Sequence, residues 1–409
     1  MTETEAPTTA AKLPLTFACG LYDRMLRLYT GEVQPRGIDL TFLANDEPRD
    51  IFDRMGGKLE FDASEMSSSE FISRFGTGHC PFVAIPAFAS RLFRHGFIFF
   101  NRKAGIRTPN DLEGKRVGVP LYTMSAAIWI RGLLQHEYGV DLSKVRWVQG
   151  ALRKPGAHGS PTVAPLLKQP DIEINRSGDS LSKLLADGEI DAVISSRPVE
   201  AIGSNPDIAR LFPNYREVEK DYYRRTRIFP IMHLIVIRRD VHEANPFVAQ
   251  SLYDALCDSK DRALALMKER GALRYMLPWL PADMDEIDDV FGGDPWPYGV
   301  EANRPTLEAL VQTWSNSTLF RGGFRSKSCS WSDADRSRCV ARGNKASARC
   351  VAATCIRPAE RRLHLTAHFH GEIVLVIDDI APFEAFALGE VALELDPVGE
   401  PERQKALGE

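Results

Sequence analysis

The sequence predicts a mixed α/β fold in which two lobes enclose a central cleft. Short apolar runs typical of strands alternate with helical patterns from Leu13 to about Val311, and this alternation favours largely parallel sheets. Hydrophobic residues make up 44% of the 409 residues, enough for a core in more than one domain. A late apolar run, residues 233–238, indicates that the chain returns to the first lobe after building the second.

The first lobe begins with strands and helices in alternation. Its strands are expected over residues 15–19, 38–43, 61–64, 82–86 and 96–100. Pro48 opens the helix between the second and third of these strands, because proline at the first helical turn lacks only an N–H that has no partner there.

The second lobe is introduced by Thr108–Val119, a capped helical turn that leads directly into a buried strand. A helix from about Ser125 to Glu137 and a strand over 144–148 follow. A further helix ends at Gly188, because glycine readily adopts the left-handed conformation at a helix end, and it leads into a strand over 192–194.

These elements define the expected domain boundaries. Lobe 1 is expected to comprise residues 13–120 and 228–312, and lobe 2 residues 121–227. The remaining residues, 313–409, form an atypical tail that we expect to be disordered or aberrant, because its basic part shows no clear apolar period.

The charge distribution supports a boundary near Thr313. Residues 313–362 carry 11 basic and 3 acidic side chains, whereas residues 363–409 carry 2 basic and 10 acidic ones. Our hypothesis is that a frame-shifted or fused sequence replaces the native final helix, although residues 373–377 retain the composition of a strand.

Overall charge and composition restrict the partners and the compartment. A net charge of −4 argues against a nucleic-acid partner, and no run of eighteen apolar residues indicates a membrane span. Residues 1–12 lack the apolar stretch of a secretory signal, so the expected location is the cytoplasm. The sparse cysteines of the first 312 residues fit a reduced protein there. Assembly into a homo-oligomer stays open.

Two segments resemble the type II periplasmic-binding-protein fold. They are Thr108–Val119, at the entry to the second lobe, and Asp187–Ala192, before its inner strand. This resemblance implies the two-lobed fold with a cleft and indicates nothing about function, because many solute receptors and a few enzymes share the fold.

Four other segments resemble the 4,5-dihydroxyphthalate decarboxylase family. They are residues 48–52, 61–71, 227–233 and 297–304. The resemblance implies a cytoplasmic carboxy-lyase of phthalate degradation that converts 4,5-dihydroxyphthalate, a small aromatic dicarboxylate, to protocatechuate and carbon dioxide. The alternatives are a non-catalytic solute-binding protein for an aromatic acid and a relative that senses or makes a different aromatic acid.

Such a reaction places definite demands on the site. The ring hydroxyl para to the leaving carboxylate supplies electron density, so no metal or organic cofactor is expected. The protein must supply carboxylate-binding groups, a general acid and a partner for the phenol.

Arginines are the natural carboxylate-binding candidates, because a guanidinium matches a carboxylate with two parallel hydrogen bonds. Arg197 follows the strand over 192–194, whose carboxyl end faces the expected cleft, and we favour a substrate contact. Arg24 follows the first strand, where a binding and a structural role are equally expected. Arg91 and Arg94 fit either substrate contacts or surface cations near a helix end.

Two residues are candidates for catalysis. His233 opens the returning strand at the lobe boundary, which favours proton transfer, although a histidine at such a position is usually a core residue. Glu65 could act as an acid or base if a dry cleft raises its pKa, or it could anchor a buried arginine.

Hydroxyl side chains at two predicted helix starts complete the candidate site. They are expected to bind a carboxylate or the phenol, with helix capping as the alternative role. The first group is Ser67, Ser68 and Ser69, and the second is Tyr122, Thr123 and Ser125.

Overall fold

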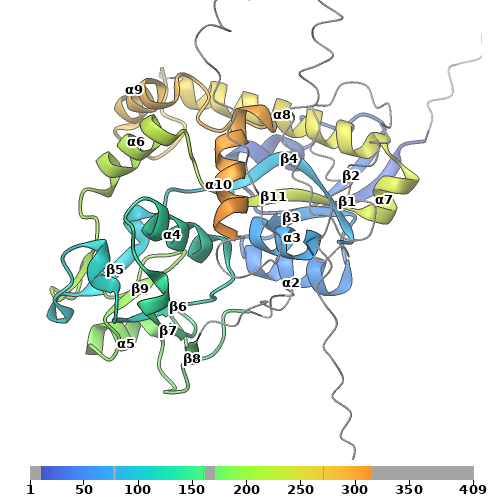
Figure 1. The fold of residues 1–409 in the computed structure, drawn as a ribbon. Coiled ribbons are helices and arrows are strands. Elements are labelled where there is room, and N and C mark those ends of the chain that lie inside the picture. The colour runs from blue at the N-terminus through green and yellow to red at the C-terminus, as the bar shows by residue number, and fades with distance from the viewer. Residues whose placement is uncertain (1–10, 77–79, 160, 162–170, 270, 315–409) are drawn as a thin grey trace, which may run out of the picture. The chain divides into compact units, whose positions relative to one another are not determined.

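The computed structural model describes residues 11–76, 80–159, 161, 171–269 and 271–314. Within these residues the strands form two sheets, one of five strands and one of six (Figure 1). This arrangement confirms the mixed α/β prediction. The expectations for the tail lie outside the described residues from position 315 onward.

The first sheet has the strand order β2-β1-β3-β11-β4. Strand β1 runs parallel to β2 and β3, whereas β11 runs antiparallel to β3 and β4. The strands are β1 (Leu13–Cys19), β2 (Ile38–Ala44), β3 (Ala63–Ser67), β4 (Phe82–Arg91) and β11 (Ile231–Arg238).

The second sheet has the order β10-β5-β9-β6-β7-β8. Strands β9, β6, β7 and β8 are parallel neighbours, and β5 runs antiparallel to β9 and β10. The strands are β5 (Ile98–Asn101), β6 (Arg116–Val119), β7 (Arg146–Gln149), β8 (Ile172–Ile174), β9 (Ala192–Ile194) and β10 (Ile208–Arg210).

Helices connect and cover these strands. They are α1 (Leu26–Tyr29), α2 (Pro48–Lys58), α3 (Ser68–Phe75), α4 (Ser125–His136), α5 (Leu181–Asp187), α6 (Tyr215–Thr226), α7 (Arg239–Ala244), α8 (Phe247–Lys268), α9 (Leu280–Phe291) and α10 (Arg304–Trp314). Within the described ranges, none of them combines the length and the apolar composition that a bilayer span requires.

The chain crosses between the sheets twice. It passes from β4 of the first sheet to β5 of the second, and it returns with β11. Each sheet thus contains one antiparallel strand, β11 or β5, that follows a crossing. This is the two-lobed plan of the type II periplasmic-binding-protein fold that the sequence predicted.

The observed crossing lies earlier than the predicted lobe boundary. Strands β5 and β6 belong to the second sheet, whereas the expected lobe 1 included residues up to 120. The pairings that assign them are Phe99 with Val193 and Gly118 with Val193. Apolar strand patterns look alike in both lobes, so the sequence alone does not show which sheet such a strand joins.

The returning strand β11 is apolar because both of its faces are covered. Ile235, Val236 and Ile237 are fully buried although successive side chains point to opposite faces. Helix α8 lies on one side of the first sheet, and α2 and α3 lie on the other (Figure 1). A continuous apolar run is what such a central strand requires.

The predicted alternation of strands and helices ends at about Val311; helix α10 extends three residues further and packs against α4. The Thr313 side chain lies so close to Gly132 of α4 that an added Cβ would be 2.5 Å from it. The next residue, Trp314, is buried. The boundary that the charge distribution suggested at Thr313 therefore falls inside a packed helical turn.

Candidate active site

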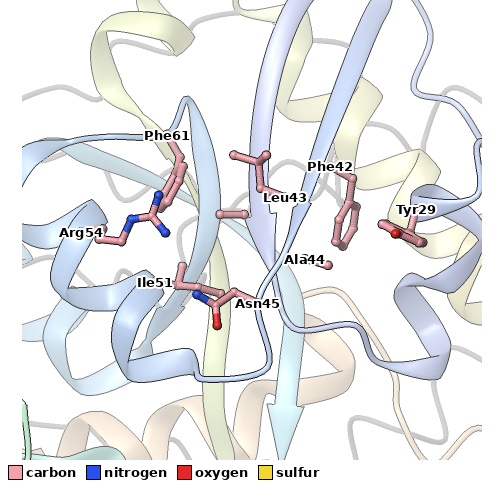
Figure 2. A pocket seen from close by; sticks show the side chains of 9 residues that line it. Tyr29, Phe42, Leu43, Ala44, Asn45, Ile51, Arg54 and Phe61 are labelled. Carbon is pink, nitrogen blue, oxygen red and sulfur yellow. The ribbon is translucent and has the colours of Figure 1, made fainter.

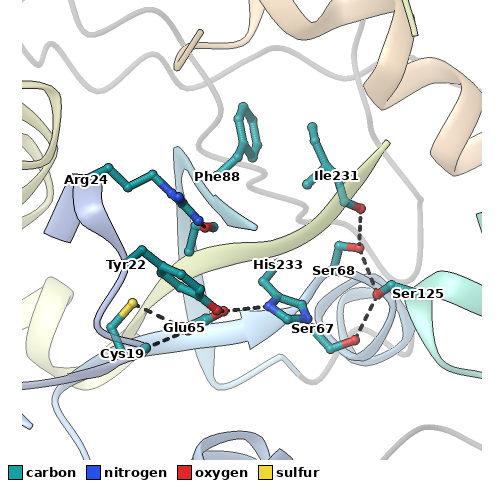
Figure 3. A network of polar contacts seen from close by, with 12 residues as sticks. Cys19, Tyr22, Arg24, Glu65, Ser67, Ser68, Phe88, Ser125, Ile231 and His233 are labelled. Atoms are coloured by element: carbon teal, nitrogen blue, oxygen red, sulfur yellow. Dashed lines mark hydrogen bonds and ion pairs between the residues drawn. The ribbon is translucent and has the colours of Figure 1, made fainter. Parts of the chain in front are cut away.

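A fully buried carboxylate, Glu65 of β3, forms the centre of the candidate site (Figure 3). Four donors surround its two oxygens. Oε1 accepts from the Tyr22 hydroxyl at 2.7 Å and from His233 Nδ1 at 2.5 Å; Oε2 accepts from the Gly20 N–H at 3.0 Å and from the Cys19 thiol at 3.4 Å. A buried carboxylate with this many donors is held in one orientation.

The sheet register brings Glu65 and His233 together across 168 positions of sequence. Glu65 pairs directly with Ile235 in the antiparallel β3–β11 ladder. His233 lies two residues before Ile235, so it is the diagonal neighbour of Glu65 on the same face of the sheet. The contact therefore follows from the pairing of rigid strands.

The surroundings keep Glu65 ionised and its neighbours protonated. Burial raises the pKa of Glu65, but the hydrogen bond and charge of His233, with the Gly20 and Tyr22 donors, outweigh it and lower the pKa below its ordinary value. Burial, followed by the charge of Glu65, raises the pKa values of both Tyr22 and Cys19. Tyr22 is therefore a neutral phenol, Cys19 a neutral thiol and Glu65 an ionised carboxylate.

His233 is oriented by this carboxylate. Its Nδ1 faces Glu65, so Nδ1 carries the proton that the carboxylate accepts. Its ring packs edge-on against Phe52 at a centroid distance of 4.9 Å. The side chain is 20% exposed, and no hydrogen-bond partner of Nε2 lies among the described residues. Nε2 is therefore the nitrogen available for proton exchange.

The predicted serines meet at the junction of the two lobes (Figure 3). The Ser125 hydroxyl, at the start of α4, lies 2.9 Å from the Ser67 hydroxyl, 3.0 Å from the Ser68 hydroxyl and 3.1 Å from the Ser69 N–H. The Ser67 side chain, at the N-cap of α3, makes no capping hydrogen bond. The hydroxyls thus join α3 to α4, and their predicted binding role stays a prediction.

The other predicted hydroxyl residues lie just before α4. Tyr122 and Thr123 are both buried. The Tyr122 N–H donates to Gln149 Oε1 at 2.8 Å, whereas the Thr123 hydroxyl has no hydrogen-bond partner among the residues that the structure describes. The Tyr122 ring packs against the guanidinium of Arg131, a residue that sequence reasoning missed.

The two arginines predicted to bind substrate occupy different surroundings. The Arg24 guanidinium lies 4.2 Å from the ring centre of Tyr22 and 4.3 Å from that of Trp296, and its Nε donates to the Ala89 carbonyl at 3.0 Å. This packing supports the Tyr22 side of the Glu65 cluster. The Arg197 side chain is 53% exposed and forms an ion pair with Glu47 at 3.1 Å. Substrate binding by either arginine stays a prediction.

Arg91 and Arg94 are buried, so the surface-cation alternative for them is wrong. Burial lowers the pKa of each guanidinium to about 9. Arg91 donates to the Phe229 carbonyl at 3.2 Å, and Arg94 to the Ser196 carbonyl at 3.2 Å. Both arginines therefore connect segments where the chain passes between the lobes.

A separate pocket of about 380 Å³ opens beside β1, β2 and α2 (Figure 2). Aromatic side chains and Arg54 line it, but none of the predicted site residues does. Arg54 is already paired with Glu60 and Asp50. No group of three or more His, Cys, Asp or Glu residues in the described part of the chain is placed to hold a metal ion.

Comparison with known proteins identifies the family. The chain is 35% identical over 307 residues to a 4,5-dihydroxyphthalate decarboxylase from Comamonas testosteroni, an alignment covering 74% of this chain and 91% of the relative. The chain belongs to the 4,5-dihydroxyphthalate decarboxylase family. A protein of the same name from Pseudomonas putida is 36% identical over 219 residues, covering 53% of this chain and 84% of that one. The resemblance that four sequence segments indicated is confirmed.

Other comparisons add less to this family assignment. No protein-family model matches the chain. The periplasmic aliphatic sulphonate binding protein SsuA from Escherichia coli aligns with a TM-score of 0.44 and 11% identity, over 76% of this chain and 94% of that one. The fold of this family member is assigned from its own strand order.

Proposed function

We propose that the chain decarboxylates 4,5-dihydroxyphthalate to protocatechuate and carbon dioxide, with His233 as the general acid. The observation that carries the proposal is the Glu65–His233 pair, in which a buried carboxylate orients an imidazole whose Nε2 is unpartnered among the described residues. Membership of the family supplies the substrate class. Ionised Glu65 accepts the Nδ1 proton, which leaves Nε2 to deliver the proton to the substrate.

The reaction needs one proton and no external electrons. Electron density from the hydroxyl para to the leaving carboxylate moves into the ring, and His233 Nε2 delivers a proton to the carbon that carries this carboxylate. The bond between that carbon and the carboxylate then breaks, and its electron pair restores the aromatic ring as carbon dioxide leaves. A proton from solvent restores His233, so each turnover consumes one proton.

The binding site in this proposal lies between the lobes, where Ser67 and Ser125 meet beside β11. Ser67 is the register partner of His233, which brings the hydroxyl cluster next to the proton donor. In the proposal, Ser67, Ser68, Ser69 and Tyr122 contact the substrate's polar groups when the lobes separate. A cytoplasmic location belongs to the proposal too, and the free thiols of Cys19, Cys80 and Cys257 fit a reducing compartment.

The deciding experiment incubates the purified full-length chain with 4,5-dihydroxyphthalate and measures carbon dioxide and protocatechuate together. His233→Ala should reduce kcat by about 10²–10⁴-fold, the usual contribution of a general acid. His136→Ala, at the exposed end of α4, is the matched control and should retain wild-type turnover. In heavy water the product should carry one deuterium at the carbon that lost its carboxylate.

Two outcomes would contradict this proposal. Tight binding of the substrate without turnover would identify a solute-binding protein instead. Full activity of His233→Ala would leave the decarboxylase in place but remove His233 as its acid.

A further inference from the structure

The start of α4 presents buried backbone donors that lack acceptors. Its N-cap residue, Met124, has no oxygen with which to cap the helix. The first backbone bond of the helix runs from the Ile128 N–H to the Met124 carbonyl at 3.0 Å. Among the described residues, the N–H groups of Ser125, Ala126 and Ala127 have no acceptor, and all three residues are buried. A buried helix start without partners is unusual and calls for a ligand.

Two side chains at the same end of α4 are also unsatisfied. The buried Thr123 hydroxyl has no hydrogen-bond partner in the described part of the chain. Arg131 is 1% exposed, and none of its three guanidinium nitrogens has hydrogen-bond geometry to an acceptor or forms an ion pair among the described residues; the neighbouring Tyr122 hydroxyl favours its charged form but does not outweigh burial. Its guanidinium carbon lies 3.5 Å from the ring centre of Tyr122, three residues before α4. Helical side chains lean toward the N-terminus, which brings this cation back to the helix start.

An unpaired buried cation is unfavourable in the free protein. Burial lowers the pKa of Arg131 because it disfavours the charged form. An anion with two acceptor oxygens would match the guanidinium fork, and it would also accept from the helix N–H groups and from Thr123. A carboxylate has this charge and this geometry.

Helix α4, which carries the unsatisfied donors, contacts the strand that carries the proposed proton donor. The Trp129 indole N–H donates to the Ile231 carbonyl at 2.8 Å, which holds α4 against β11 two residues before His233. At the helix start, Ser125 lies 2.9 Å from Ser67, the register partner of His233. In an ortho-dicarboxylate, the two carboxylates occupy adjacent ring carbons. If one carboxylate is bound at the start of α4, the ring carbon that carries the other carboxylate is directed toward β11.

We propose that Arg131, Thr123 and the first turn of α4 bind the carboxylate that the substrate keeps, and that this subsite selects aromatic ortho-dicarboxylates over monocarboxylates. The inference rests on the proposed function for the identity of the substrate. Carboxylate binding at the subsite does not require turnover, so unreactive ligands can test the subsite.

Calorimetric titration of the full-length protein with phthalate and with benzoate provides the test. The wild type should bind phthalate more tightly, and Arg131→Met should lose about 10- to 100-fold in phthalate affinity, as expected for charge-assisted hydrogen bonds, with little change for benzoate. Melting of the free Arg131→Met variant should occur at or above the wild-type temperature, because the change removes a buried unpaired charge. A merely structural arginine would show the opposite, a lower melting temperature.

Arg239→Met is the matched control, because Arg239 is a partly buried arginine of the first lobe that already donates to the Cys80 and Phe82 carbonyls. It should leave the ratio of phthalate to benzoate affinity unchanged. Thr123→Val should reduce phthalate affinity by a smaller factor than Arg131→Met. If Arg131→Met does not fold, the titrations of Thr123→Val test the subsite in its place.

An unchanged affinity ratio in both Arg131→Met and Thr123→Val would overturn the subsite, as would equal losses for the two ligands. Selective phthalate binding by a protein that does not convert 4,5-dihydroxyphthalate would instead overturn the proposed function and leave the subsite standing.

Discussion

Glu65 in the first lobe and Arg131 in the second are both fully buried charges, and they differ in their partners. Four donors surround the Glu65 carboxylate, whereas the Arg131 guanidinium has an aromatic ring and no acceptor among the described residues. A buried charge that is fully hydrogen-bonded is preorganised, because its orientation is fixed before any ligand binds. A buried charge without partners gains them only from a ligand.

Among the variants that test this comparison of Glu65 with Arg131, Glu65→Gln should have the largest effect on stability and turnover. The amide keeps the size of the side chain but removes the charge that the Tyr22 and His233 donors surround. Breaking a buried pair costs about 3–5 kcal/mol of unfolding free energy, and loss of the oriented acid should lower kcat by about 100-fold or more. Urea unfolding and turnover measure the two effects. Glu32→Gln, a change at an exposed residue, is the control.

Acid titration sharpens the same point. The folded-state pKa of Glu65 is lowered, so its contribution to stability is complete above the unfolded value of about 4.3 and is lost as pH falls through the folded-state pKa. The wild type should therefore lose stability on acidification in this window, and Glu65→Gln should lack that part of the loss. Parallel curves for the two proteins would show that the pKa of Glu65 is the same in the folded and unfolded states and would contradict this prediction.

Tyr22→Phe should have a smaller effect, because it removes one of the four Glu65 donors and leaves His233 in place. The expected loss of unfolding free energy is about 1.5–3 kcal/mol, the range for a hydrogen bond to a charged group. If Tyr22 positions the carboxylate, kcat should fall while KM stays close to the wild-type value. An equal change in both constants would contradict this role.

Arg197→Ala is expected to have the smallest effect. An exposed ion pair such as that with Glu47 contributes about 0–1 kcal/mol, and salt screens it. In phthalate titrations, a far smaller loss of affinity than in Arg131→Met would contradict the predicted substrate contact of Arg197. A larger loss in Arg197→Ala would show that the arginine selected from the sequence binds the substrate after all.

Much of the fold could be predicted, because strand and helix periodicities are local. The alternation of elements, the returning strand over 233–238 and the helix end at Gly188 all have local signals, and the structure contains them. The assignment of β5 and β6 to the second sheet could not be predicted, because it depends on pairing between distant strands.

Only part of the site can be predicted, because local sequence patterns indicate single residues but not the contacts between distant strands. Glu65 and His233 are each recognisable in the sequence as a polar residue in or beside an apolar strand, but their contact depends on the register of β3 and β11. Arg131 was missed because a single arginine in a helix is usually exposed. A usable signal was present: Ile128, Ile130 and Leu134 make α4 apolar on several sides, so a charge within it has little chance of reaching water.

The packing of α10 against α4 has a practical consequence for work on a shorter chain. Thr313 lies against Gly132, next in sequence to Arg131, and Trp314 belongs to the same core as α4. A chain shortened to end after Trp314 retains every strand and helix in Figure 1. A chain shortened to Val311, where the predicted α/β alternation ends, would expose the back of the helix that carries the proposed carboxylate subsite.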